Sequence, residues 1–204
     1  MIIVKAKPQF GTSYDIGWIG FTRTFDLIGD AIAYGERWER TGTTPAVNHV
    51  LIVTGNGTCV QAHCRYGVQP GKLSDYLDDP ASRVYFRKPI GWTPGLGGRI
   101  VATAMFKIGC KYANGLILEQ TAADTILGHF LNVISRGWIH YTLAKLIARP
   151  DEFICSTLGA LALASQPEFK GSSVLKEPLA SIDPQTLFED DADFDPTVID
   201  CSKV

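Results

Sequence analysis

The stretch DEFICSTLGALALA, residues 151–164, is the most informative part of the chain, because a polar approach is followed at once by small and aliphatic side chains. This pattern predicts a buried helix whose first turn carries Cys155. Backbone N–H groups and the positive end of the helix dipole stabilise negative charge there, so we expect the pKa of Cys155 to lie well below the free-thiol value of about 8.5. A buried, unreactive cysteine is the alternative, since cysteine is among the most often buried residue types.

A candidate base lies far upstream, in the stretch NHVLIVTGNG at residues 48–57. Its β-branched run ends in a Gly/Asn turn signal, which predicts that His49 begins a strand. The stretch TCVQAHC at 58–64 predicts a second strand, and alternation along it puts Gln61 and His63 on one face. Adjacent antiparallel strands can then place Gln61 or His63 beside His49. A cysteine nucleophile, a histidine base and a polar orienting residue are the parts that covalent acyl chemistry needs.

The order of these residues resembles the circularly permuted NlpC-like branch of the papain-like fold, which includes the YiiX-type proteins and relatives of lecithin-retinol acyltransferase. In that branch a histidine strand comes first, a strand ending in a polar residue and alanine follows, and a Cys-Ser helix comes last. The chain has His49, Gln61-Ala62 and Cys155-Ser156 in this order. Weaker but ordered similarities occur at 67–77, 109–116 and 182–188. The resemblance implies an α+β fold, with an antiparallel sheet or barrel packed on helices.

The same resemblance implies site residues: Cys155 as nucleophile, His49 as base and Gln61 as orienting residue. The orienting position is often Glu in this branch, and Gln61 lacks the charge that would stabilise the imidazolium, although a neutral amide can still orient the ring. The backbone N–H of Cys155 is the candidate oxyanion donor, because it lies at the helix start. Tyr112 and Trp18 are candidate substrate-binding residues, and buried aromatic packing is the alternative for Trp18.

The composition predicts one compact domain, because 204 residues with 46% hydrophobic and 20% charged residues are ordinary globular usage. We expect this domain to span 1–188, with a helical insertion at about 120–148 and an acidic, solvent-exposed tail at 189–204. The formal net charge of −2 and the scattered basic residues argue against a nucleic-acid partner. The apolar start of the chain predicts a first strand and lacks the order of a secretory signal. With five cysteines, an odd number, we expect a cytoplasmic protein, or one released in association with a phage.

Two further patterns affect the choice of ligand. Residues 125–148 have apolar side chains at helical spacing, interrupted by polar ones, which excludes a membrane span. Packing on the core, covering the cleft, binding a partner and lying on a membrane surface remain alternatives for this segment.

Cys59 and His63 lie roughly 13 Å apart along an extended strand, whereas ligands of one zinc ion lie within about 2.3 Å of it. We therefore expect neither a metal nor another cofactor, and the sequence leaves the oligomeric state open.

The sequence therefore predicts a cysteine hydrolase, either an amidase or an endopeptidase, or an acyltransferase. The resemblance implies a peptide, peptidoglycan or lipid substrate with an amide or ester bond. A noncatalytic interaction or virion-assembly protein is the alternative; it would keep the fold and use the aromatic segment near Trp138 as its contact surface.

Overall fold

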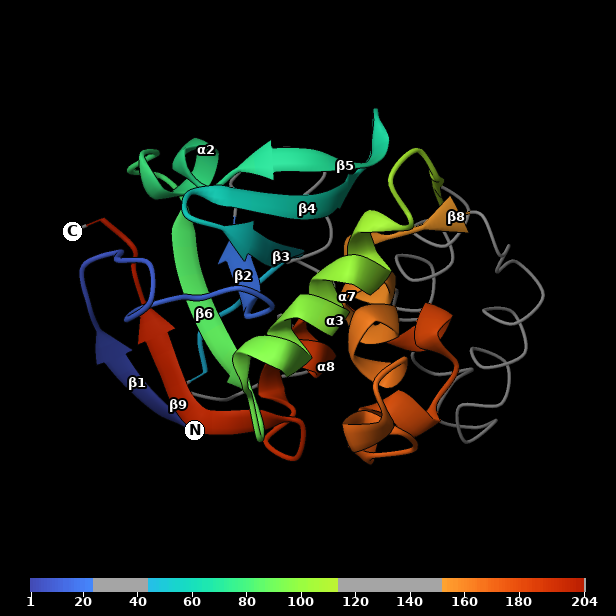
Figure 1. The fold of residues 1–204 in the computed structure, drawn as a ribbon. Coiled ribbons are helices and arrows are strands. Elements are labelled where there is room, and N and C mark those ends of the chain that lie inside the picture. The colour runs from blue at the N-terminus through green and yellow to red at the C-terminus, as the bar shows by residue number, and fades with distance from the viewer. Residues whose placement is uncertain (24–43, 114–151, 204) are drawn as a thin grey trace, which may run out of the picture.

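A computed structural model describes residues 1–23, 44–113 and 152–203 of the chain (Figure 1). The fold is α+β and is built on a seven-stranded mixed sheet of order β1-β9-β6-β2-β3-β4-β5. Neighbouring strands are antiparallel except β1 and β9, which run parallel. The strands of this sheet are β1 (Ile2–Lys5), β2 (Ile19–Arg23), β3 (His49–Gly55), β4 (Thr58–His63), β5 (Gly67–Lys72), β6 (Arg83–Pro89) and β9 (Phe194–Asp200).

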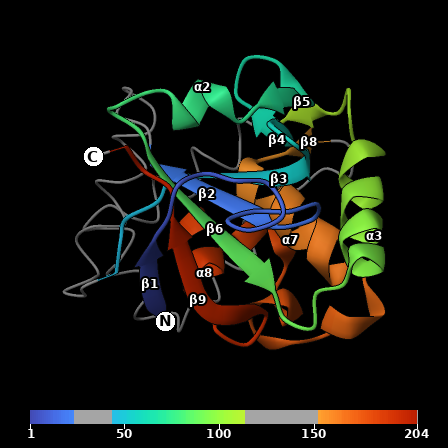
Figure 2. The same ribbon diagram turned by 60° about the vertical axis from the view of Figure 1, so that its left-hand side comes forward.

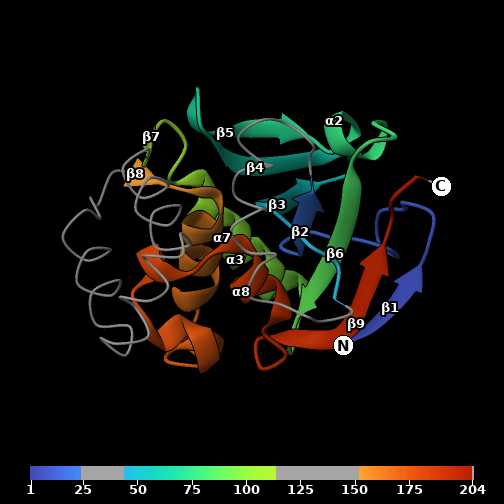
Figure 3. The same cartoon turned by 180° about the vertical axis from the view of Figure 1, so that it is seen from behind.

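Shorter elements surround the sheet. A parallel pair joins β7 (Lys111–Tyr112) to β8 (Glu152–Phe153). The helices of the described residues are α2 (Ser74–Leu77), α3 (Pro94–Met105), α7 (Cys155–Ala164) and α8 (Pro184–Glu189), with 3-10 turns η1 (Pro167–Phe169), η2 (Ser173–Lys176) and η3 (Leu179–Ser181). Seen from behind, α8 lies beside α7 (Figure 3).

The sheet curls so that both faces of β3 are covered. Val50 and Ile52 belong to the apolar cluster formed with α3 and α7. Leu51 and Val53 belong to a second cluster on the concave side of the sheet. Figure 2 shows α2 crossing above the strands between the ends of β5 and β6, both of which it contacts. A strand buried on both faces has a continuous apolar run, which explains the unbroken VLIV sequence.

Helix α7 approaches β3 closely because Gly159 has no side chain. A Cβ at Gly159 would lie 2.9 Å from Cγ1 of Val50 and 3.3 Å from Cδ2 of Leu187. Glycine costs about 1 kcal/mol relative to alanine inside a helix, and here it permits the close approach that seats the helix start against β3. The predicted helix with Cys155 in its first turn is confirmed.

The C-terminal segment corrects the prediction of an exposed acidic tail at 189–204. Strand β9 lies inside the sheet, between β1 and β6. Asp190 and Asp193 are buried. The fully buried guanidinium of Arg87 explains how this segment is held: it donates to backbone oxygens of Phe188 at 2.5 Å and Asp190 at 3.1 Å, and contacts the Asp191 carboxylate at 2.8 Å. The acidic composition suggested a solvent-exposed tail. Its burial could not be predicted locally, because the partner, Arg87 on β6, lies about a hundred residues earlier in the sequence.

The predicted first strand is confirmed as β1. Helix α3 starts at Pro94, where the Thr93 hydroxyl caps the helix by accepting from the N–H of Leu96 at 3.2 Å. The insertion predicted at 120–148, with Trp138, lies outside the described residues. Within the described ranges, no helix is both long and apolar enough to cross a membrane.

Candidate active site

His49 and Gln61 meet on the concave side of the sheet. His49 opens β3, and Gln61 lies on β4 opposite Leu51, so alternation puts both side chains on one face. The Oε1 atom of Gln61 lies 2.7 Å from Nε2 of His49. Gln61 is buried, with 5% of its surface exposed. The other candidate orienting residue, His63, accepts a hydrogen bond at Nδ1 from the backbone N–H of Arg65 in its own turn.

Tyr76 on α2 joins this pair, and it is the site residue that sequence analysis missed. Its hydroxyl donates to the same Oε1 atom of Gln61. Its ring stacks on the His49 imidazole, with centroids 5.8 Å apart and an interplanar angle of 27°. Burial raises the pKa of Tyr76, so the hydroxyl stays protonated and can donate. The only sequence signal was that Tyr76 lies in the stretch 67–77, which resembles the NlpC-like branch. That resemblance does not indicate whether the side chain of Tyr76 points towards His49 or into solvent.

The shared acceptor fixes the tautomer of His49. An amide oxygen has two lone pairs and no hydrogen, so Oε1 of Gln61 accepts from both the Tyr76 hydroxyl and His49 Nε2. Nε2 therefore carries the hydrogen of the neutral ring, and Nδ1 keeps a lone pair that can accept a proton. Gly71 leaves space for the amide group, because a Cβ there would lie 2.7 Å from Nε2 of Gln61.

Cys155 lies at the same end of β3. It is the first residue of α7 and is buried, with 5% of its surface exposed. A backbone hydrogen bond from Val50, the residue after His49, reaches its thiol. Burial raises the pKa of Cys155 to about 11, and the hydrogen bonds from Val50, Ser156 and its own backbone offset only part of this effect. The expected low pKa is thus wrong for this conformation: loss of water outweighs the favourable helix start.

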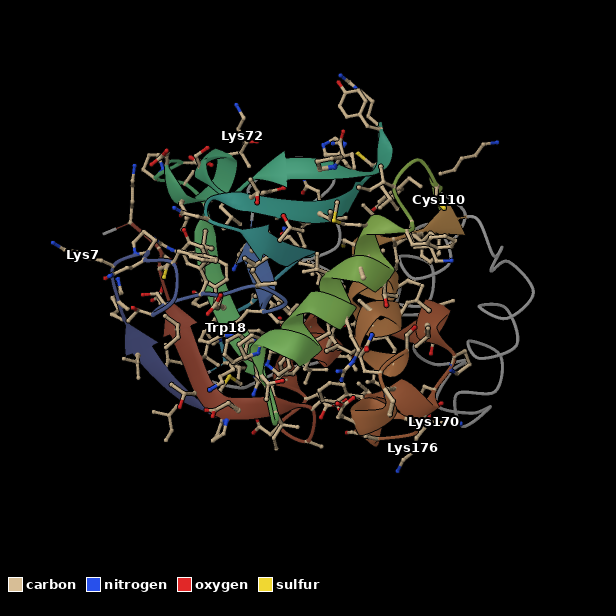
Figure 4. The ribbon with its side chains drawn as sticks, in the orientation of Figure 1. Lys7, Trp18, Lys72, Cys110, Lys170 and Lys176 are labelled. Atoms are coloured by element: carbon tan, nitrogen blue, oxygen red, sulfur yellow. The ribbon has the colours of Figure 1, made fainter. Side chains whose placement is uncertain are left out.

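The two predicted substrate-binding residues occupy different regions. Tyr112 on β7 pairs with Phe153 of β8, two residues before Cys155, so its backbone lies beside the segment that leads into α7. Trp18 precedes β2, and its carbonyl accepts from Val53 N–H, four residues along β3 from His49 and thus roughly 13 Å away. Figure 4 shows Trp18 and Cys110 at opposite ends of α3. The structure therefore does not bring Trp18 to Cys155 and His49.

Trp18 instead packs edge-on against Trp92, with ring centroids 6.3 Å apart. The cysteines and histidines considered above as zinc ligands do not converge: across the part of the chain that the structure describes, no three His, Cys, Asp or Glu side chains are grouped so that they could hold a metal ion.

No protein-family model, no curated protein and no solved structure matches this chain. The resemblance to the NlpC-like branch therefore rests on the order of His49, Gln61 and Cys155 in the sequence. The chemistry has to be argued from the geometry of these side chains.

Proposed function

We propose that the protein is a cysteine hydrolase or acyltransferase with a permuted papain-like architecture. Its catalytic residues are Cys155, His49 and Gln61, and its substrate carries an amide or ester bond in a peptide, peptidoglycan or lipid. The observation that carries the proposal is the 2.7 Å contact between His49 Nε2 and Gln61 Oε1. It occurs beside Val50, whose backbone hydrogen-bonds the Cys155 thiol.

In this mechanism Nδ1 of His49 takes the proton from Sγ of Cys155 while the sulfur attacks the substrate carbonyl carbon. The backbone N–H of Cys155 donates to the oxyanion that forms. The intermediate collapses to a thioester, and His49 gives its proton to the departing nitrogen or oxygen. Water or another acceptor then attacks the thioester, His49 takes the proton of that acceptor, and the thiol of Cys155 is restored as the acyl product leaves.

The raised pKa of Cys155 determines when the proton moves. A thiol with a pKa of about 11 is neutral near pH 7, so deprotonation has to accompany the attack. The environment of His49 supports the same order, since Gln61 offers no charge to a resting imidazolium. The proposed enzyme therefore uses general-base catalysis on a neutral thiol. A stored thiolate–imidazolium pair is not required.

The direct test is to trap the acyl-enzyme. The protein is incubated with p-nitrophenyl esters of short acyl chains, and its intact mass is measured. We expect one added acyl group on the wild type, none on Cys155→Ser, and an unchanged yield on the control Cys110→Ser, which replaces a partly exposed cysteine. Equal acylation of wild type and Cys155→Ser would overturn the assignment and favour the noncatalytic alternative.

A further inference from the structure

A pocket with a volume of about 690 Å³ lies at the end of the β3–β4 hairpin that carries Gly57. Strand β3 runs from His49 to Gly55, six residues further along the chain, and a strand rises by about 3.3 Å per residue. Gly57 lies in the turn that follows Gly55, so the pocket and His49 lie at opposite ends of this strand. The volume is in the range of small-molecule sites, about 300–1,000 Å³. Five separate parts of the chain form its walls: residues 5–8, Tyr14, Gly57, residues within 72–78, and 201–203.

Positive charge is concentrated around this pocket. Four lysines line it with a single aspartate, Asp78. Lys203 is paired with Asp78, at 3.3 Å between Nζ and Oδ1. Lys5, Lys7 and Lys72 have no carboxylate partner among residues 1–23, 44–113 and 152–203. Because the whole protein has a formal net charge of −2, this local excess of positive charge favours an anionic ligand.

The interior of the pocket is apolar and ordered. Tyr14 and Leu73 line it and are buried. The ring of Tyr14 is fixed by stacking on Phe86, with centroids 4.9 Å apart. Burial raises the pKa of Tyr14, so its hydroxyl stays protonated. The three unpaired lysines are exposed, and in Figure 4 the labelled side chains of Lys7 and Lys72 extend outward from the ribbon in different directions.

We propose that this pocket binds a small organic anion. Its phosphate or carboxylate group is held by Lys5, Lys7 and Lys72, and its apolar part lies against Tyr14 and the partly exposed Leu77. A free metabolite and the headgroup of an anionic lipid share this chemistry. The proposal is independent of the chemistry assigned to Cys155, since the pocket does not include that residue or His49.

Octyl phosphate is a suitable probe, because it joins a phosphate to an apolar chain. Its binding is measured by calorimetry on the wild type, on Lys7→Gln/Lys72→Gln, and on the control Lys170→Gln/Lys176→Gln. The control removes the same charge at positions away from the pocket (Figure 4). Because the pocket variant loses two charge-assisted contacts to the anion, we expect at least a tenfold loss of affinity in it and little change in the control.

Amide chemical shifts on titration locate the bound probe. We expect the largest changes at Gly57, Ser74 and Lys203, and weaker binding at high salt because salt screens exposed charges. Absence of binding, equal losses in the two double variants, or shifts elsewhere on the protein would overturn the proposal. Sedimentation with phosphatidylcholine vesicles, with and without phosphatidic acid, then distinguishes the sources: lysine-dependent sedimentation assigns a lipid headgroup, and binding of octyl phosphate alone assigns a soluble anion.

Discussion

Tyr76 and His49 stack on one another with ring centroids 5.8 Å apart, and both contact the same oxygen of Gln61. The two rings come from α2 and β3, and the shared acceptor comes from β4. Tyr76 therefore restrains the amide that orients His49, although it is not itself one of the proposed reacting groups. In the proposed enzyme it is a positioning residue.

Replacing Tyr76 by Phe keeps the stacked ring and removes the hydroxyl donor. A neutral hydrogen bond contributes about 1 kcal/mol to stability, so we expect kcat to fall about fivefold. This loss is far smaller than the 10²- to 10⁴-fold loss expected for His49→Ala, which removes the base. The measurements are kcat as a function of pH and the ¹⁵N chemical shifts of the His49 ring, which report its tautomer.

Tyr66→Phe is the matched control, because Tyr66 is exposed and its ring lies beside His63. We expect it to change neither kcat nor the His49 shifts. Wild-type ¹⁵N shifts in Tyr76→Phe, together with a loss of activity, would show that the hydroxyl does not act through the orientation of His49.

Gln61→Glu introduces a charge where the neutral amide contacts His49. A carboxylate favours the imidazolium, so we expect the pKa of His49 to rise and the acidic limb of the pH–rate profile to move to higher pH. Gln61→Ala has a different result: control of the tautomer is lost while the base remains, so its rate loss is milder than that of His49→Ala. A Gln61→Glu profile that superimposes on the wild type would contradict the orienting role.

The raised pKa of Cys155 predicts an unusual order of thiol modification. Near pH 7 we expect iodoacetamide to modify the partly exposed Cys64 and Cys110 before Cys155, which is neutral and 5% exposed. Modification of Cys155 accelerates as the pH approaches about 11, where the thiolate forms. Peptide mass spectrometry after short exposures measures each rate, and circular dichroism verifies that the fold persists. Preferred labelling of Cys155 near pH 6 would show that the site stores a thiolate.

The sequence predicted the parts of the site that depend on local pattern. Each of three local patterns depends on only a few neighbouring residues. The Gly/Asn turn predicted the end of β3, the alternation along β4 predicted the face of Gln61, and the small residues after Cys155 predicted α7. Tyr76 and the pKa of Cys155 could not be predicted, because they depend on how α2 and α7 pack against strands distant in the sequence. The burial of Asp190 and Asp193 likewise depends on long-range packing of the C-terminal segment against the rest of the fold.

Asp193 provides a test of that C-terminal packing through the pH dependence of stability. Its Oδ1 accepts from the Ser172 hydroxyl, and Oδ2 is buried with no hydrogen-bond partner among the described residues. Burial, with a smaller contribution from Asp190, raises the pKa of Asp193 to about 6, above the value of about 3.9 for an unfolded chain. The folded protein therefore binds this proton more tightly, so its contribution to stability grows as the pH falls from above 6 towards 4.

Asp193→Asn mimics the protonated acid and should remove this dependence. We expect the variant to have a higher free energy of unfolding than the wild type at about pH 8, and the difference to be about half as large at about pH 5, which lies midway between the folded and unfolded pKa values of Asp193, measured by urea denaturation. Asp195→Asn is the matched control: the pKa of Asp195 is lowered by the backbone N–H of Thr197, so its titration lies below this window and its difference from the wild type should stay constant. A constant difference for Asp193→Asn as well would show that Asp193 is ionised throughout the window, which requires water or a cation at Oδ2 in the folded protein.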